Sequence, residues 1–186
     1  MEIDIDTNED NDTRNIFLTD DISQSSVDAA IQSIIEFNQE DDKGEAEKVK
    51  YKREVIKVYI SSEGGCVYAG FGLTDIIRSS KTTVHTYCIG QAMSAGLMIF
   101  CAGHKRIMYK YSTLMFHSVA NGAIGKLQTI VEITEETKRV QRQYDDIVVG
   151  CSKVTRAKLA QVVKAKSDWF ISSEEAVKLK LCDEVL

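Results

Sequence analysis

The sequence predicts an α/β fold built on a mainly parallel β-sheet, and two stretches carry this prediction. Residues 55–60 are mostly apolar and β-branched, end in a glycine turn at 61–65, and are followed by helical spacing of apolar residues over 67–77. Residues 84–89 repeat the order, because this second strand-like run turns at 90–96 and leaves into an apolar helical run. Repeated strand-then-helix units favour parallel strands joined by right-handed crossovers.

Length and composition are those of one globular domain. The chain has 186 residues, of which 44% are hydrophobic and 27% charged, enough to bury a sizeable core. Residues 1–13 are rich in carboxylates and predict an acidic flexible tail, whereas 14–186 predict the folded domain. The net charge of -5, with no basic cluster apart from 48–53, argues against broad binding to nucleic acid or to membranes.

The cysteines and the N-terminal sequence bear on the compartment. Five cysteines form an odd set without a CxxC pair, and most have apolar neighbours, as reduced core cysteines do. The start of the chain has no signal-peptide pattern, and no apolar run reaches membrane-spanning length. A cytoplasmic protein is therefore expected. No His, Cys or Asp spacing suggests zinc and no phosphate-binding loop is present, so we expect no metal, no cofactor and no ATP hydrolysis by this chain.

The first part of the domain predicts a strand, a helix and a loop. Residues 15–18 predict a short buried strand, after which Ser25 or Ser26 can cap a helix. The apolar face of that helix would consist of Val27, Ala30, Ile31, Ile34 and Ile35. The dense charge over 39–54, which includes Gly44, predicts a surface loop insertion.

The second half of the chain alternates extended and helical patterns. The predicted elements are strands at 106–109 and 114–117, a long helix at 126–149, a shorter helix at 155–164, an extended piece at 168–171 and an edge strand at 181–186. Ser172 and Glu175 have the spacing of a capping box and therefore mark the start of a last helix.

Ser94 lies in the small-residue turn between a predicted strand and an apolar helix. Backbone N–H groups in the first turn of a helix lack partners and carry the positive end of its dipole, so they can stabilise an oxyanion beside a nucleophilic serine. A serine at this position is nonetheless more often an N-cap. His117 alone is more often a buried, hydrogen-bonded histidine, and Asp168 alone could be a turn or cap residue.

Ser94 and His117 share one further feature, since each lies where a strand gives way to a helix or loop. Strand ends along one edge of a parallel sheet are where sites assemble. A Ser-His-Asp triad is therefore physically permitted there. Triads occur in several chain orders on unrelated folds, so sequence spacing does not show that Ser94, His117 and Asp168 meet.

Several motifs, in matching order, resemble the ClpP family of self-compartmentalised serine peptidases. The family's opening strand, glycine turn, serine motif, histidine motif and aspartate motif resemble residues 14–19, 59–65, 90–96, 115–118 and 167–172, respectively. The resemblance implies a ClpP/crotonase-like fold with a protruding helix-strand handle. The long helix from residue 126 and the glycine-bearing segment before it resemble that handle, through which two rings stack.

The resemblance also implies a role for each site residue. Ser94 would be the nucleophile, His117 the general base and then acid, and Asp168 the group that fixes the imidazole tautomer. The family's oxyanion donors fall on the backbone N–H groups of Gly65 and Ala95. Elementary chemistry agrees, because glycine permits close backbone approach and the residue after Ser94 offers a free first-turn N–H.

The same resemblance implies a substrate and an assembly. An extended peptide would lie between residues 65–68 and 120–125, where backbone pairing accepts many sequences. The implied substrate-binding residues are Gly64, Cys66, Val67, Asn121, Gly122 and Ala123. The expected oligomer is a heptameric ring, stacked as a tetradecamer, that acts on unfolded proteins or short peptides with a Clp-type ATPase unfoldase. Glu63 and Ser167 stand where the family usually has proline and arginine.

Three alternatives are open. The chain could be a weakly active or non-catalytic ring subunit that partners an active paralogue, although the intact set of Ser94, His117 and Asp168 argues against this. It could be a specialised processing protease, for instance of a viral head. It could also be a crotonase-type acyl-CoA enzyme, since that superfamily holds an oxyanion with paired backbone N–H groups, but such chemistry needs no serine elbow.

Overall fold

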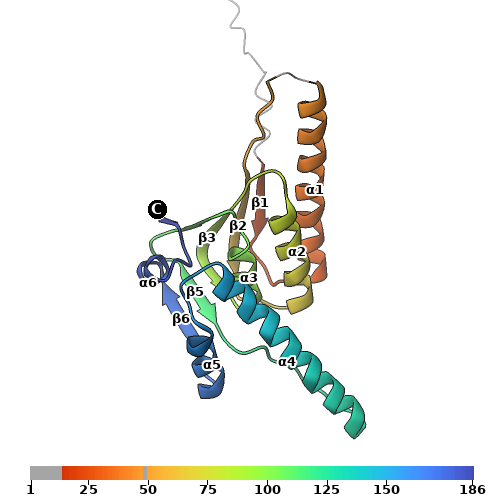
Figure 1. Ribbon diagram of the computed structural model, residues 1–186, viewed down its shortest axis with the longest axis vertical. Helices are drawn as coiled ribbons and strands as arrows, with labels where there is room; N and C mark the ends of the chain where they lie inside the picture. The colour runs from red at the N-terminus through yellow and green to blue at the C-terminus, as the bar shows by residue number, and fades with distance from the viewer. Residues whose placement is uncertain (1–13, 48–49) are drawn as a thin grey trace, which may run out of the picture.

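The computed structural model describes residues 14–47 and 50–186 (Figure 1). It confirms the predicted α/β architecture, with a mainly parallel sheet flanked by helices. The acidic tail predicted for 1–13 lies outside the described residues. Within the described ranges, no helix is both long and apolar enough to cross a membrane.

The described strands form one seven-stranded sheet. Its main path runs through β1 (Asn15–Leu18), β2 (Ile56–Ser62), β3 (Val84–Met93), β4 (Lys105–Met108) and β7 (Glu184–Val185), and each neighbouring pair is parallel. The end of β3 also pairs in parallel with β5 (Thr113–Phe116), which pairs antiparallel with β6 (Trp169–Ser172). β3 therefore joins the main sheet to a smaller β5–β6 extension.

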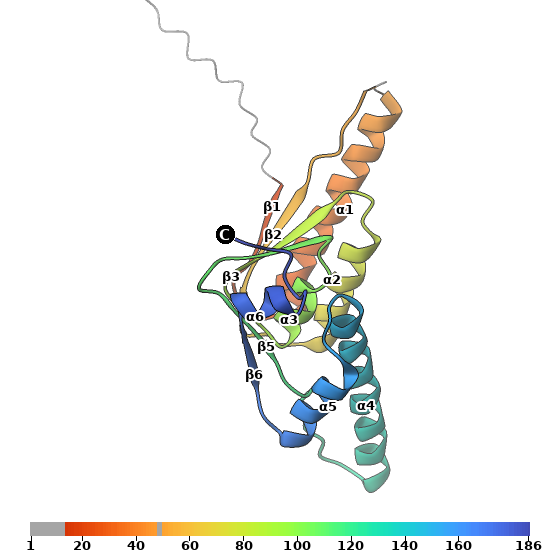
Figure 2. The same cartoon turned by 60° about the vertical axis from the view of Figure 1, so that its left-hand side comes forward.

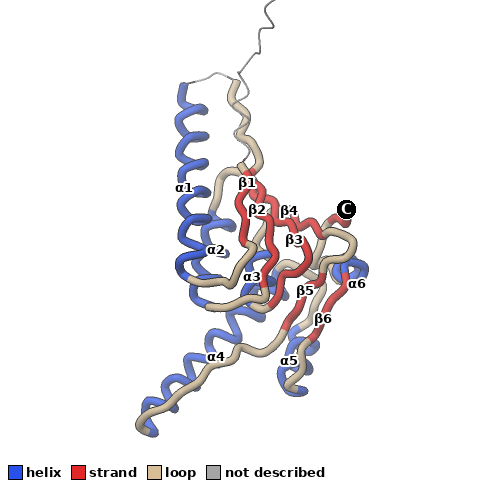
Figure 3. Tube along the Cα trace, turned by 180° about the vertical axis from the view of Figure 1, so that it is seen from behind, coloured by secondary structure: helices blue, strands red, loops and turns tan. Residues whose placement is uncertain are grey.

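The helices lie mainly on one face of this sheet. α1 (Gln24–Glu47) and α2 (Val67–Ser79) cover that face together with the short α3 (Ala95–Phe100), while the view from behind shows the strands in front (Figures 1 and 3). α4 (Leu127–Gly150) projects away from the sheet, with α5 (Arg156–Ala165) near its C-terminal half (Figure 2). α6 (Ser173–Lys178) follows β6.

The predicted handle is present as α4, but its strand half is not formed. Residues 117–126 run beside α4 without pairing as a strand. The Val119 N–H donates to Gln141 Oε1 at 2.7 Å, and the Asn121 amide donates to the Thr137 hydroxyl at 3.3 Å. Side chains of α4 thus hold this segment in place of a strand ladder.

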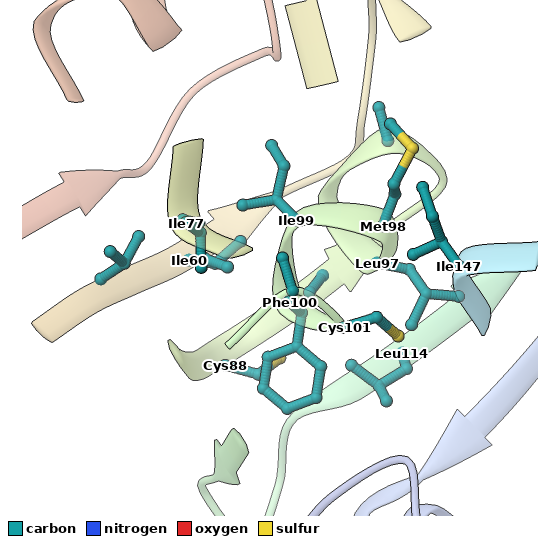
Figure 4. Close-up of a cluster of buried hydrophobic side chains, with 14 of the residues drawn as sticks. Ile60, Ile77, Cys88, Leu97, Met98, Ile99, Phe100, Cys101, Leu114 and Ile147 are labelled. Carbon is teal, nitrogen blue, oxygen red and sulfur yellow. The ribbon is translucent and has the colours of Figure 1, made fainter. Parts of the chain in front are cut away.

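The core is centred on α3 (Figure 4). Residues 97–100 are all fully buried, so this helix is apolar on every side. Surrounding elements contribute further buried side chains, among them Ile60, Ile77, Cys88, Leu114 and Ile147. Burying an aliphatic or aromatic side chain of this size contributes about 1.5–3 kcal/mol to folding. The N-terminus of α3, next to Ser94, is therefore firmly anchored.

The prediction of a surface loop over 39–54 is wrong for its first half, because α1 continues to Glu47. The helix persists because its polar side chains have tertiary partners. The Asn38 amide donates to the Ser80 hydroxyl at 2.8 Å, and its carbonyl accepts the Thr82 N–H at 3.1 Å. The densely charged stretch is therefore a helix in its first half, and the polar side of this helix makes tertiary hydrogen bonds. The sequence alone does not distinguish such a helix from a solvated loop.

Asp41 in the same helix is a completely buried carboxylate. It accepts hydrogen bonds from Arg14 at 2.8 Å, from the Tyr51 hydroxyl at 2.6 Å, and from the Thr82 hydroxyl. Burial by itself raises the pKa of Asp41, but the hydrogen bonds from Arg14, Thr82 and Tyr51 outweigh it and lower the pKa below its ordinary value. The network ties the end of α1 to the start of β1.

We expect Asp41→Asn to lower the free energy of unfolding at pH 7 by about 3–5 kcal/mol, because it breaks a buried ion pair on one side only. A carboxyl with a lowered folded-state pKa stabilises the fold above its unfolded pKa of about 3.9, and the contribution is lost as pH falls through the folded value. In urea unfolding experiments from pH 7 to pH 3, the free energy of unfolding of the wild type should therefore fall toward that of the variant. The exposed Asp75→Asn is the matched control, and parallel pH profiles for wild type and Asp41→Asn would contradict the prediction.

The cap of α1 differs from the prediction. Ser23, rather than Ser25 or Ser26, caps the helix, and its hydroxyl accepts the Ser26 N–H at 3.2 Å. Ile22 is extended and bridged in parallel to Gly65. The turn into the helix therefore falls at Ser23, before the predicted caps. The chain then turns directly into α1 at Gln24.

Candidate active site

Ser94 occupies the turn between β3 and α3 in a backbone conformation that L-residues rarely adopt, with φ 51° and ψ -118°. Such a conformation costs about 1–3 kcal/mol and persists only when its surroundings hold it. The Ser94 N–H donates to the Met115 carbonyl at 2.9 Å, and the Ser94 carbonyl accepts from the Tyr144 hydroxyl at 3.0 Å. The Ser94 side chain makes no capping hydrogen bond to α3, so its hydroxyl is not used as an N-cap.

Strand register brings the three predicted residues to one edge of the sheet. Met93 of β3 lies opposite Met115 of β5, so Ser94 and His117 follow paired strands at the same end. Phe116 of β5 lies opposite Trp169 of β6, which places Asp168 directly before the antiparallel partner. The sheet thus gathers residues that are far apart in sequence.

The contacts among these side chains differ in quality. His117 Nε2 lies 2.8 Å from Ser94 Oγ, within hydrogen-bond distance. His117 Nδ1 lies 3.5 Å from Asp168 Oδ1, which is an ion-pair distance rather than a short hydrogen bond. The Asp168 side chain is 52% exposed, against 32% for His117, so water competes for this carboxylate. Ser94 and His117 are therefore closely coupled and Asp168 more loosely.

Gly64 makes room for the serine turn. Its φ is 109°, a region that favours glycine, and a Cβ there would lie 2.7 Å from Ser94 Cβ and 2.8 Å from the Met93 carbonyl oxygen. No side chain fits at this point without displacing the backbone that carries Ser94. Gly64, predicted as a substrate-binding residue, thus lies against the back of the turn.

Two backbone amides are available beside the serine. The N–H groups of Gly65 and Ala95 donate no hydrogen bond to another residue in the described part of the chain. Ala95 is the first residue of α3, where helix geometry leaves the N–H without a partner. Both residues line the same cleft as Ser94. Unpaired N–H groups of this kind can stabilise a developing oxyanion.

The cleft has a volume of about 390 Å³. Among the predicted substrate-binding residues, Cys66, Val67 and Asn121 line it, whereas Gly64, Gly122 and Ala123 do not. A Cβ on Gly122 would have no atom within 4 Å, so this glycine lies in open space. Both predicted segments therefore border the cleft, the second only as far as Asn121.

The sequence predictions missed part of the lining. The residues outside the predicted segments are Glu63, Met98, Val119, Thr137, Val140 and Tyr144. Val140 and Tyr144 belong to the apolar side of α4, so the helical spacing shows that they face the protein. That they face this cleft depends on where α4 packs, which spacing does not reveal.

No grouping of three or more His, Cys, Asp or Glu side chains in the described ranges is arranged to hold a metal ion. Among the described residues, the groups arranged around Ser94 are its own hydroxyl, the His117 imidazole, the Asp168 carboxylate behind that imidazole, and the unpaired N–H groups of Gly65 and Ala95.

Comparisons with known proteins identify relatives of this chain. The chain matches the Clp protease family over residues 4–186. It is 31% identical over 175 residues to the ATP-dependent Clp protease proteolytic subunit of Borreliella afzelii, covering 93% of this chain and 83% of that protein. It is 32% identical over 133 residues to the ATP-dependent Clp protease proteolytic subunit 2 of Chlamydia trachomatis, covering 70% of this chain and 64% of that protein, which is less than two thirds of the relative's length.

A solved structure shares the fold. A point mutant of ClpP1 from Listeria monocytogenes superposes with a TM-score of 0.76 at 22% identity, covering 94% of this chain and 92% of that one. At this identity the likeness shows the fold alone. The family match and the sequence identities carry the assignment: this chain belongs to the Clp protease family.

Proposed function

We propose that the chain is a serine endopeptidase that cleaves unfolded proteins or short peptides with Ser94, His117 and Asp168. The observation that carries the proposal is the 2.8 Å contact between Ser94 Oγ and His117 Nε2 at a strained strand-to-helix turn. A serine hydroxyl is a weak nucleophile until an adjacent base takes its proton. Membership of the Clp protease family, and relatives named as proteolytic subunits, support the same reaction class.

The proposed reaction proceeds through an acyl-enzyme. Ser94 Oγ attacks the scissile carbonyl carbon while His117 Nε2 takes its proton, and the carbonyl oxygen becomes an oxyanion facing the N–H groups of Gly65 and Ala95. His117 then gives the proton to the leaving amine, and the C–N bond breaks. Water repeats the sequence on the ester, releasing the acid and restoring Ser94. Asp168 stabilises the imidazolium form of His117 in both halves.

The cleft supports a substrate in extended conformation. Residues 65–68 form one wall and 119–121 the other, with Val67, Met98 and Val140 supplying apolar surface. Backbone pairing with an extended chain accepts many sequences, and the apolar surface adds modest selectivity. A folded domain does not present such a strand, so the proposed substrates are unfolded proteins or short peptides. Gly122 and Ala123 would meet a peptide only beyond the cleft.

We further propose that the chain works inside a ring-shaped chamber, as heptamers stacked into a tetradecamer. α4 and the segment before it expose apolar side chains that a single chain leaves uncovered, including Ile124, Leu127, Ile130 and Val131. Exposed apolar surface of this kind marks an interaction site. The relatives are named ATP-dependent, and this sequence has no phosphate-binding loop, so a separate Clp-type ATPase would supply unfolded chains.

The test is whether Ser94 reacts and peptide is cleaved. A serine-directed phosphonate should label the protein at Ser94, mapped by peptide mass spectrometry, and a fluorogenic peptide should be hydrolysed by the same preparation. Native mass measurement reads the ring number in parallel. A folded ring without labelling would favour a non-catalytic subunit, and saturable coenzyme A binding would favour acyl-CoA chemistry. Hydrolysis restricted to one capsid-type sequence would favour a processing protease.

Asp168→Asn is expected to lower kcat by about 10–100-fold, less than the roughly 10⁴-fold found where the aspartate is buried and tightly hydrogen-bonded. The smaller effect follows from the 3.5 Å separation and the half-exposed carboxylate. Steady-state hydrolysis of a fluorogenic peptide measures it, with the exposed Asp75→Asn as control. Wild-type turnover in Asp168→Asn would remove Asp168 from the proposed site.

A further inference from the structure

The Tyr144 side chain on α4 hydrogen-bonds to the backbone of the turn that carries Ser94. The hydroxyl donates to the Ser94 carbonyl at 3.0 Å, and the side chain is buried. The Phe116 ring packs against it with the ring centroids 5.0 Å apart. Burial raises the pKa of Tyr144 well above its ordinary value, so the hydroxyl remains a proton donor at neutral pH.

The carbonyl that Tyr144 binds belongs to the same peptide unit as the Ala95 N–H. A trans peptide unit is planar, and its C=O and N–H point in opposite directions. A hydrogen bond that fixes the Ser94 oxygen therefore also fixes the direction of the Ala95 hydrogen. It further polarises the unit, because hydrogen bonds in a chain strengthen one another.

Few other hydrogen bonds act on the oxygen of this peptide unit. Among the described residues, its oxygen accepts only one further hydrogen bond, from the Met98 N–H at the longer distance of 3.3 Å. The bond from the Ser94 N–H to Met115 acts on the preceding peptide unit. The strained Ser94 backbone persists only while its surroundings hold it, and the bonds to this oxygen are among the contacts that do so. Tyr144 supplies the shorter of the two bonds that hold it.

We propose that the Tyr144 hydroxyl is a positioning group for the oxyanion: by holding the Ser94–Ala95 peptide unit, it aims the Ala95 N–H at the oxygen of the scissile carbonyl. Tyr144 acts through this peptide unit, whereas its ring serves only as part of the cleft wall. The inference rests on the proposed peptidase function and deepens it. It assigns to a side chain of α4 a role in transition-state stabilisation.

Tyr144→Phe tests the inference, because it keeps the ring and its packing on Phe116 and removes only the hydroxyl. Losing an oxyanion donor altogether costs about 10²–10³ in kcat, so a misdirected donor is expected to cost about tenfold. KM should stay within about twofold, because the oxyanion contact is realised only in the transition state. Tyr111→Phe, at an 88% exposed tyrosine, is the matched control and should keep wild-type kinetics.

A second readout separates positioning from a general structural role. A peptide boronate forms a tetrahedral adduct with a serine hydroxyl and so mimics the oxyanion state. We expect Tyr144→Phe to weaken boronate binding about tenfold and to leave binding of the same peptide without the boronate unchanged. Replacing Tyr144 with 3-fluorotyrosine keeps the hydroxyl donor and should keep wild-type kcat and boronate affinity.

Three results would overturn the inference. One is wild-type kcat and boronate affinity in Tyr144→Phe. Another is equal weakening of the boronate and the plain peptide, or a large drop in unfolding temperature, since either means that the hydroxyl acts on the fold. The third is a tenfold loss in the 3-fluorotyrosine protein. If the wild-type protein neither cleaves peptide nor reacts with phosphonate, the proposed function itself is wrong, and this inference fails with it.

Discussion

Replacing Ser94 by alanine is expected to lower kcat for a fluorogenic peptide by roughly 10⁴–10⁶-fold, as removal of the nucleophile does in other serine peptidases. Without Oγ there is no atom to form the acyl-enzyme, and His117 loses its 2.8 Å partner. The substitution removes a hydroxyl that caps no helix, so the fold should keep its stability. Steady-state hydrolysis and phosphonate labelling measure the loss, and thermal unfolding checks the fold.

The matched control for Ser94→Ala is Ser79→Ala, which removes an exposed serine hydroxyl at the end of α2. It should retain full turnover and full labelling. Residual turnover in Ser94→Ala that phosphonate still abolishes would reveal a contaminating peptidase. Turnover by purified, unlabelled Ser94→Ala at the wild-type rate would show that Ser94 is not the nucleophile.

Gly65→Ala is expected to lower kcat/KM by about 10²–10³, the cost of losing one oxyanion donor. The φ of Gly65 is 141°, and a Cβ there would lie 2.3 Å from the Ile22 carbonyl oxygen, so the backbone must shift. The shift moves the Gly65 N–H away from the cleft. It should also reduce the free energy of unfolding by about 1–3 kcal/mol, the usual cost of a strained non-glycine residue.

Gly150→Ala is the control for this substitution, because a Cβ at Gly150 would meet no atom within 4 Å. It replaces a glycine at the end of a helix by alanine and should leave activity unchanged, with equal or slightly higher stability. Peptide hydrolysis and urea unfolding of both variants give the comparison. A Gly65→Ala protein with wild-type kcat/KM would exclude the Gly65 N–H from the proposed oxyanion site.

Local patterns predicted the elements that depend on neighbouring residues. The strand-turn-helix units around Gly64 and Ser94 are present, and the Ser172 hydroxyl caps the last helix by accepting the Glu175 N–H at 3.3 Å. These features follow from backbone preference and short-range hydrogen bonding, which a short window of sequence contains. The extension of α1 to Glu47 was missed because its stability comes from Asp41 and its distant partners.

The candidate site shows the same division. The sequence placed Ser94 and His117 at strand ends, but the 2.8 Å contact between them depends on the pairing of β3 with β5. The looser 3.5 Å contact of Asp168 depends on β6 lying antiparallel to β5. The role of each residue in catalysis remains a proposal that the variants above test.

By itself, the sequence determined the α/β class, the order of the motifs and the residue types available for chemistry, because periodicity and turn residues are properties of adjacent positions. Only the tertiary structure decided which of these residues meet and how the serine turn is held. Strand register joins Ser94 to His117, and α4 brings the Tyr144 hydroxyl to the Ser94 carbonyl across fifty positions. Contacts between distant positions form only when the core packs, so no local pattern encodes them.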